Sequence, residues 1–156
     1  MNVVVGGEMI TKKNIFFYDE VDNKVVPDSL FVQTGFSNGL FSMSGIYINT
    51  FFTVMRSDKY FKKYKYILDP KINTTQIETL IKIEELILNS IDRPNLSKIY
   101  RLKDQLASLS ILVFDCVDVL NNNHKSYDIN LMLKISGVWI TENDCGITFK
   151  FFHINN

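Results

Sequence analysis

The segment from Arg56 to Tyr66 combines positive charges with aromatic rings in a way that suits a binding surface. It reads RSDKYFKKYKY, so that five basic residues interleave with four rings and Asp58 is the only acid. Single-stranded nucleic acid needs cations for its phosphates and flat partners for its unstacked bases. The pattern therefore predicts a surface for single strands. The alternative is a surface strand or loop whose lysines are solvated and whose rings enter the core.

Later residues extend the predicted surface. Lys134 and Lys150 fall on the outward faces of the last two predicted strands. Trp139, the only tryptophan, is either a stacking platform beside Gly137 or a partly buried core residue, which is the commoner place for a tryptophan on a strand. The predicted nucleic-acid-binding set is Arg56, Lys59, Tyr60, Phe61, Lys62, Lys63, Tyr64, Lys65, Lys134, Trp139 and Lys150.

Possible metal ligands form two Cys-x7-His pairs, and their spacing does not favour zinc. The residues are Cys116, His124, Cys145 and His153. Structural zinc sites usually contain two cysteines separated by only two to four residues. Cys145 and His153 also have the residue types of a nucleophile and a base, without any further supporting pattern. We therefore expect no metal.

The acidic residues do not form a catalytic pattern either. Asp115 and Asp118 lie three apart on a predicted strand, which places them on opposite faces. Asp19, Glu20 and Asp22 fit a polar hairpin tip. Gly6-Gly7 lacks the Gly-Lys-Ser/Thr of a phosphate-binding loop. The sequence therefore predicts a protein that is not an enzyme and that carries no cofactor.

The first third of the chain predicts β-structure. Asn38-Gly39 is a hairpin signal, because both residues accept a positive φ, and Gly45 indicates a bulge or bend. β-Branched and aromatic runs indicate strands. The expected strands are residues 15–18, 24–26, 30–33, 40–43 and 46–55.

The middle of the chain predicts two helices. Thr75 and Glu78 fit a capping box at the start of the first helix, whose apolar spacing continues to Ile91 before Pro94 ends it. Asn95 is expected to cap a second helix that reaches Leu109. The two would form a helical hairpin.

The last third returns to strands. Residues 110–120 form one run, with Leu112, Phe114 and Cys116 as inward candidates. Residues 131–136 alternate with period two, and Gly137 marks a bulge. In the final strand Ile147, Phe149 and Phe151 share one face, opposite Thr148, Lys150 and Phe152. The expected core includes Phe31, Ile46, Ile48, Leu80, Ile87, Ile99, Leu106, Phe114, Leu133 and Phe149.

This order of elements predicts one α+β domain over residues 1–156. Short antiparallel strands hide their edges by closing into a sheet or a partly open barrel. The two helices would be inserted between the N-terminal and C-terminal strands. Such an insertion between the third and fourth strands is similar to the oligonucleotide/oligosaccharide-binding (OB) architecture.

Composition limits the classes of function. Lysine and arginine together number 17 and so do aspartate and glutamate, so the net charge is zero, which excludes a polybasic or an acidic tail-like chain. Hydrophobic residues make up 46%, which excludes disorder. No run of 18 apolar residues predicts a membrane helix, and residues 1–10 lack the features of a secretory signal. We expect a cytoplasmic or nuclear protein with free thiols rather than a disulfide.

Residues 133–152, LKISGVWITENDCGITFKFF, resemble the C-terminal end of small proteins of arthropod-infecting DNA viruses. The upstream segment Gly45-Ile46-Tyr47-Ile48 fits the same resemblance. The chain holds 18 Ile, 15 Asn and 14 Lys against one Ala and three Arg, a bias typical of A/T-rich codons. The resemblance implies a single-stranded DNA-binding or replication accessory role. The acidic tail of many such binders is missing here.

The sequence therefore predicts a non-catalytic, sequence-tolerant protein that binds single-stranded nucleic acid, in viral replication. The alternative is a structural or scaffold-type subunit that acts through protein contacts. In either case we expect a homo-oligomer, because closed symmetric assemblies are the commonest outcome for soluble proteins.

Overall fold

The computed structural model describes residues 4–114 and 125–154, and the fold is α+β. Asp115, Cys116, Asp118 and His124 therefore lie outside the described residues. No helix in the described ranges is long and apolar enough to cross a membrane. The elements are β1 (Val5–Gly6), the short 3-10 helix η1 (Gly7–Met9), β2 (Ile15–Asp22), β3 (Leu30–Ser37), β4 (Ser42–Ser44), β5 (Ile46–Tyr60), β6 (Lys63–Leu68), α1 (Thr74–Asn89), β7 (Ser97–Ile99), α2 (Arg101–Ala107), β8 (Ser110–Phe114), β9 (Tyr127–Ile140) and β10 (Asp144–His153).

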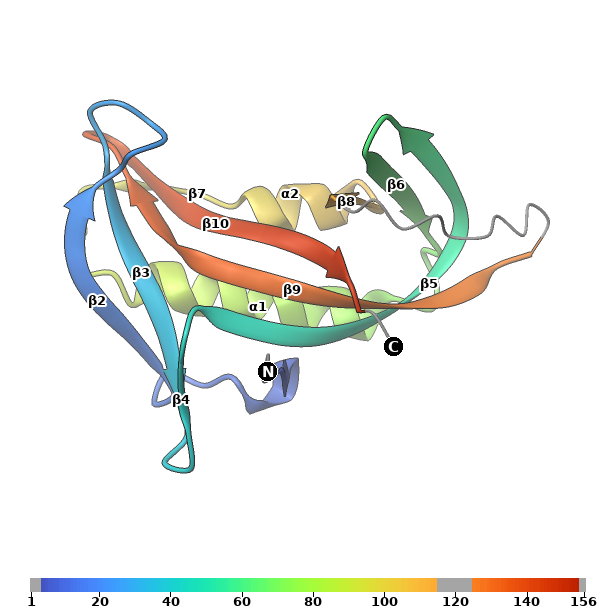
Figure 1. Ribbon diagram of the computed structural model, residues 1–156, viewed down its shortest axis with the longest axis horizontal. Helices are drawn as coiled ribbons and strands as arrows, with labels where there is room; N and C mark the ends of the chain where they lie inside the picture. The colour runs from blue at the N-terminus through green and yellow to red at the C-terminus, as the bar shows by residue number, and fades with distance from the viewer. Residues whose placement is uncertain (1–3, 115–124, 155–156) are drawn as a thin grey trace.

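Five strands close into a barrel in the order β5–β6–β8–β10–β9 and back to β5 (Figure 1). Most of the pairs are antiparallel, while β8 and β10 run parallel and meet at Val113 and Phe151. Closure is possible because β5 is long enough to pair with β9 over residues 46–54 and with β6 over residues 54–60. The sequence predicts an antiparallel sheet or a partly open barrel. The structure has a barrel, but its ring is closed and includes one parallel pair.

Strand β9 also pairs with strands that lie outside the barrel. Its last residues pair with β3, which pairs in turn with β2 and β4 (Figure 1). The register of β9 against β10 shifts between Thr148 and Phe149, opposite Ser136 and Gly137, which confirms the predicted bulge. A Cβ on Gly137 would lie 2.4 Å from the Val32 carbonyl oxygen, so only glycine lets β3 approach here.

Some of the predicted turns are confirmed, and one predicted strand is not. Asn38-Gly39 connects β3 to β4, and Gly45, with a φ of +80°, forms the corner between β4 and β5. The predicted strand at residues 24–26 is wrong, because these residues form a loop in which Asn23 Oδ1 accepts the backbone N–H groups of Val25 and Val26.

The barrel interior is filled by alternate residues of the ring strands. Of the predicted core, six residues are buried, namely Ile46, Ile48, Leu80, Ile87, Leu106 and Leu133. Phe31, Ile99 and Phe149 are half-buried. Phe114 is a clear correction, because Ile111 and Val113 face inward and Phe114 is 41% exposed. Leu112 likewise faces outward, so the phase predicted for β8 was reversed.

The two helices lie between the second and third barrel strands, one position earlier than expected. The first helix begins at Thr74 and not in a Thr75–Glu78 capping box. Asn73 precedes it and is used differently: its Nδ2 donates to the Thr53 carbonyl at 2.8 Å, and its Oδ1 accepts the Thr53 N–H at 2.8 Å. The side chain thus pairs with β5 as a neighbouring strand would.

The predicted second helix is replaced by a strand, a shorter helix and another strand. Residues 97–99 form β7 and pair in parallel with residues 144–146, while β8 pairs with β10 again at Phe151. Within the described residues, no strand pairs with β10 on this side over residues 147–150. Helix α2 lies there instead, and two of its own side chains, Leu102 and Leu106, are buried.

A buried carboxylate joins the two helices. Glu84 on α1 is fully buried and accepts the backbone N–H groups of Leu102 at 3.0 Å and Lys103 at 2.9 Å. These amides belong to the first turn of α2, whose free N–H groups need acceptors. Desolvation by burial raises the pKa of Glu84 above its ordinary value of 4.5, and the two amides counteract part of that shift.

We predict that Glu84 makes folding stability depend on pH. Because its pKa is raised in the folded state, this carboxyl contributes most to stability below pH 4.5 and loses that contribution as pH rises through the raised pKa. Urea unfolding of the wild type and of Glu84→Gln from pH 4 to pH 8 isolates the effect, since all other groups are shared. The wild type should lose stability relative to the variant as pH rises. A constant difference would contradict the assignment. Glu84→Ala, which leaves the buried Leu102 amide and the part-buried Lys103 amide without this acceptor, should cost about 2 kcal/mol.

Candidate nucleic-acid interface

The hairpin formed by β5 and β6 divides the basic-aromatic segment between two faces. Arg56 pairs with Ile67 and Asp58 with Lys65, and these residues alternate with the interior side chains of β6. Lys59 instead pairs with Tyr64, and its Nζ lies 5.7 Å from the Tyr64 ring centroid. The segment is therefore not one continuous surface, which corrects the expectation from its spacing.

Tyr64 faces the barrel interior and is only 6% exposed. Its ring lies parallel to that of Tyr66, and both rings contact His153 edge-on. The Tyr66 hydroxyl and His153 Nε2 are 2.6 Å apart. The expectation that Tyr64 offers a face to a base is therefore wrong, because its neighbours inside the barrel already cover it. The side chain of Tyr60 lies outside the described part.

Phe61 stands at the opposite extreme, at the tip of the same hairpin. Its side chain is 99% exposed, and its φ of +51° is in the left-handed region that bulky residues disfavour. Lys62 beside it is exposed too. A strained, fully exposed aromatic residue stabilises nothing in the fold, and such residues are typical of functional positions.

Three strands bring cations around one outward ring. Lys63 of β6 pairs in register with Phe114 of β8, and its Nζ lies 4.7 Å from the Phe114 ring centroid. Lys150 of β10 places its Nζ 5.6 Å from the same centroid. Cation–π contacts hold both ammonium groups beside a ring that remains partly open to solvent. This part of the barrel surface therefore offers positive charges beside an exposed aromatic ring.

A groove continues from this cluster along the edge of β10. We call it the outer groove; its volume is about 360 Å³ and it lies between α2 and β10. It exists because α2 replaces a paired strand there. Its lining comes from Arg101 and Gln105 of α2, Leu112 and Phe114 of β8, Trp139 of β9 and residues 147–151 of β10, and none of these residues is acidic.

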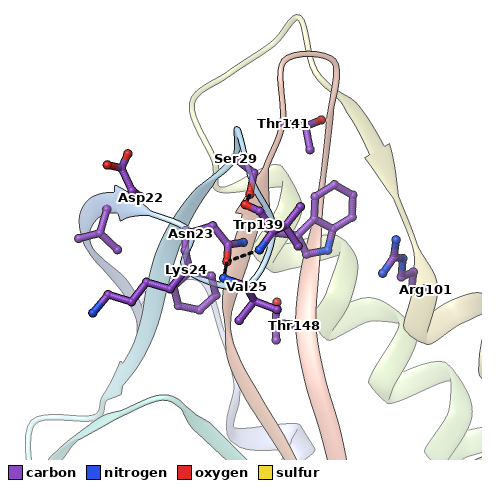
Figure 2. Close-up of a pocket in the computed structure, with 12 residues that line it drawn as sticks. Asp22, Asn23, Lys24, Val25, Ser29, Arg101, Trp139, Thr141 and Thr148 are labelled. Carbon is purple, nitrogen blue, oxygen red and sulfur yellow. Dashed lines mark hydrogen bonds between the residues drawn. The ribbon is translucent and has the colours of Figure 1, made fainter.

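Trp139 lies at the other end of the outer groove. The Arg101 guanidinium carbon is 5.1 Å from its ring centroid, so this ring too carries a cation. Arg101, Trp139 and Thr148 also line a second hollow of about 540 Å³, the loop cavity, which residues 21–26, Ser29, Phe31 and Thr141 complete. Figure 2 shows Trp139 beside Arg101, with the residues of the 22–29 loop facing them across the cavity.

The remaining predicted residues lie outside the groove. Lys134 pairs with Lys150, but its Nζ lies 5.6 Å from the Tyr47 ring centroid, away from Phe114. Arg56 and Lys65 lie outward on the β5–β6 hairpin. Of the predicted set, the structure thus places Lys63, Lys150 and Trp139 around the outer groove.

Sequence reasoning missed Phe114 and Arg101. Phe114 was assigned to the core because the strand pattern of residues 110–120 allowed either phase. Arg101 has no assigned role in the sequence analysis, because its distance from Trp139 in sequence gives no signal. The run Ile111–Phe114 does alternate, so the more exposed phase could have been considered.

Cys145 does not have the character of a nucleophile or ligand. It is 2% exposed, and desolvation raises the pKa of its thiol, which disfavours the reactive thiolate. No cluster of three or more histidine, cysteine or acidic side chains suited to a metal occurs among the described residues.

Comparison of the chain with protein-family models, with curated proteins and with solved structures finds no match.

We predict that Phe61→Gly stabilises the protein by about 1 kcal/mol, because glycine adopts the positive φ without steric cost. Thermal or urea unfolding measures the change. Phe51→Gly is the matched control, since Phe51 is also an exposed aromatic residue but lies within β5, where glycine should destabilise the strand. Equal destabilisation by both variants would contradict the strain assigned to Phe61.

Proposed function

We propose that this chain is a non-catalytic protein that binds single-stranded nucleic acid with little sequence preference, along the outer groove. The observation that carries the proposal is the pairing of each groove ring with a cation: Phe114 with Lys63 and Lys150, and Trp139 with Arg101. Rings bind bases through stacking and cations bind phosphates, and neither contact depends on the identity of the base.

The position of these residues in the barrel supports the proposal. OB barrels bind oligonucleotides on the face of their second and third strands and at the loops after the first and fourth. In this barrel the second and third strands along the chain are β6 and β8, which supply Lys63 and Phe114. The loop after the first barrel strand holds Phe61 and Lys62, and the loop after the fourth begins at Thr141, which lines the loop cavity.

Zero net charge is compatible with this function when the charges are sorted locally. The groove contains Arg101 and Lys150 without a lining carboxylate, while acids such as Asp19 and Glu20 lie on β2, away from the groove. Long-range attraction of phosphates is weak for a neutral protein. The binding energy should then come from short contacts, so that affinity is moderate and depends on only a few phosphates.

We predict a shallow salt dependence of binding. If Lys63, Arg101 and Lys150 each contact one phosphate, log K should fall with log[salt] with a slope of about −2, at roughly −0.7 for each contact on a single strand. Fluorescence anisotropy of labelled oligo-dT over a series of salt concentrations measures the slope. Lys150→Ala should make the slope shallower by about 0.7. Lys82→Ala is the control, because Lys82 is an exposed lysine of α1 outside the groove, and its slope should equal that of the wild type. Absence of binding at ~20 mM salt, where screening is weakest, would refute the proposal.

We also predict that Phe114→Ala weakens binding at every salt concentration without changing the slope. The loss should be about 1–3 kcal/mol, the range measured for one stacked base. The same anisotropy titration tests this. Phe51→Ala is the matched control, because Phe51 is also an exposed phenylalanine and lies on another part of the barrel. If both variants bound as tightly as the wild type, Phe114 would not be a stacking platform.

The alternative function is assembly through protein contacts, and one observation favours it. Among the residues that the structure describes, strand β2 forms the end of the sheet order, so one of its edges has no strand beside it. Asp19, Glu20 and Asp22 lie on that strand and oppose the pairing of two copies by repulsion. For this reason we rank assembly second. Size-exclusion chromatography with light scattering separates the two: a large particle that ignores oligonucleotides would support assembly.

A further inference from the structure

The loop cavity has a composition different from that of the outer groove. Its walls are largely apolar. They include the side chains of Val21, Val25, Val26, Phe31 and Trp139. Its volume of about 540 Å³ is within the range of small-molecule sites. Apolar walls around an aromatic ring suit a flat, weakly hydrated group rather than a phosphate.

One cation lies beside the ring in the cavity. Arg101 is next to Trp139, while Lys24 and Asp22, on the opposite wall, extend away from Trp139 (Figure 2). A flat group that enters the cavity can therefore keep an attached phosphate near a positive charge.

Trp139 also has an unused hydrogen-bond donor. Its Nε1 is buried and has no hydrogen-bond partner among the described residues. A buried indole N–H normally finds an acceptor. The adjacent Arg101 has only donors and does not supply one. Nε1 lies in the plane of the indole, so a base that stacks on the ring leaves this donor as it is.

The loop cavity and the outer groove adjoin each other, since Arg101, Trp139 and Thr148 line both. A strand whose phosphates follow the groove past Lys150 would therefore bring its next base to the mouth of the cavity. Every nucleobase has a flat, weakly hydrated face, and this matches the apolar walls of the cavity.

We propose that the loop cavity is a nucleobase pocket, which takes one base turned out of the strand and packs it against Trp139. The inference rests on the proposed function and adds to it a defined base subsite. The base exchanges stacking on its neighbours for stacking on the indole and contact with the valines of the loop. Because the base meets the pocket through its flat face, which all nucleobases share, the pocket does not select one base.

The experiment uses Trp139 as its own reporter, because it is the only tryptophan of the chain. Emission of the full-length protein is recorded during titration with oligo-dT and with an abasic oligomer of the same length, which keeps the phosphates and lacks the bases. We expect oligo-dT to quench or shift the emission, and we expect the abasic oligomer to leave it unchanged. An equal response to both oligomers would overturn the pocket.

One variant removes the ring and another changes the loop cavity alone. Trp139→Leu should weaken oligo-dT binding in the anisotropy assay by roughly 5- to 150-fold, the loss of one stacked base, with an unchanged salt slope. Trp139 lines the outer groove too, so Val26→Asn separates the two sites, because Val26 is an exposed residue that lines only the loop cavity. Val26→Asn should also weaken binding with an unchanged slope, and a loss confined to Trp139→Leu would place the base in the groove and overturn the pocket. Val4→Leu is the control at an exposed valine outside the cavity and should bind as the wild type does.

The possible failures are distinguishable. If oligo-dT binds with the predicted salt slope but Val26→Asn binds as tightly as the wild type, the pocket is refuted and the proposed function remains. If oligo-dT does not bind at all at ~20 mM salt, the proposed function is refuted and the pocket with it.

Discussion

Closure of the barrel is the constraint on which the rest of this structure depends. A sheet hides its edges completely only when its first and last strands pair, and here β5 meets that condition by pairing with β9 and β6 along different parts of its length. Once the ring is closed, every strand has one interior and one exterior face. The interior takes side chains such as Ile46, Leu133 and Val113, and the exterior is left for binding.

The groove is a consequence of how the ring is completed on one side. The chain from β7 to β8 runs alongside β10 but makes strand pairs only at its two ends, and α2 occupies the middle. The helix is held in this position by Glu84, which accepts its first amide groups from α1. A single buried carboxylate therefore stabilises the element that forms one wall of the candidate interface.

Much of the fold could be read from local patterns, because those patterns are properties of single segments. The alternation of residues 131–135 and 147–151 assigns the inward faces of β9 and β10, and the bulge at Gly137 follows from a residue without a side chain. The helix at 74–89 follows from its apolar spacing. These features need no knowledge of neighbouring strands. The order of strands, helices and strands likewise determined the α+β class.

Other features were decided only by tertiary structure, because they depend on which neighbour each segment meets. The phase of β8 is set by its pairing with β6, and this turns Val113 inward and Phe114 outward. The same pairing buries Tyr64 and separates it from Lys63, although the two are adjacent in sequence. Lys63, Phe114 and Lys150 come together across three strands, and Arg101 reaches Trp139 from a helix. The sequence by itself thus determined which residue types were available for binding, and ring closure decided which of them share a surface.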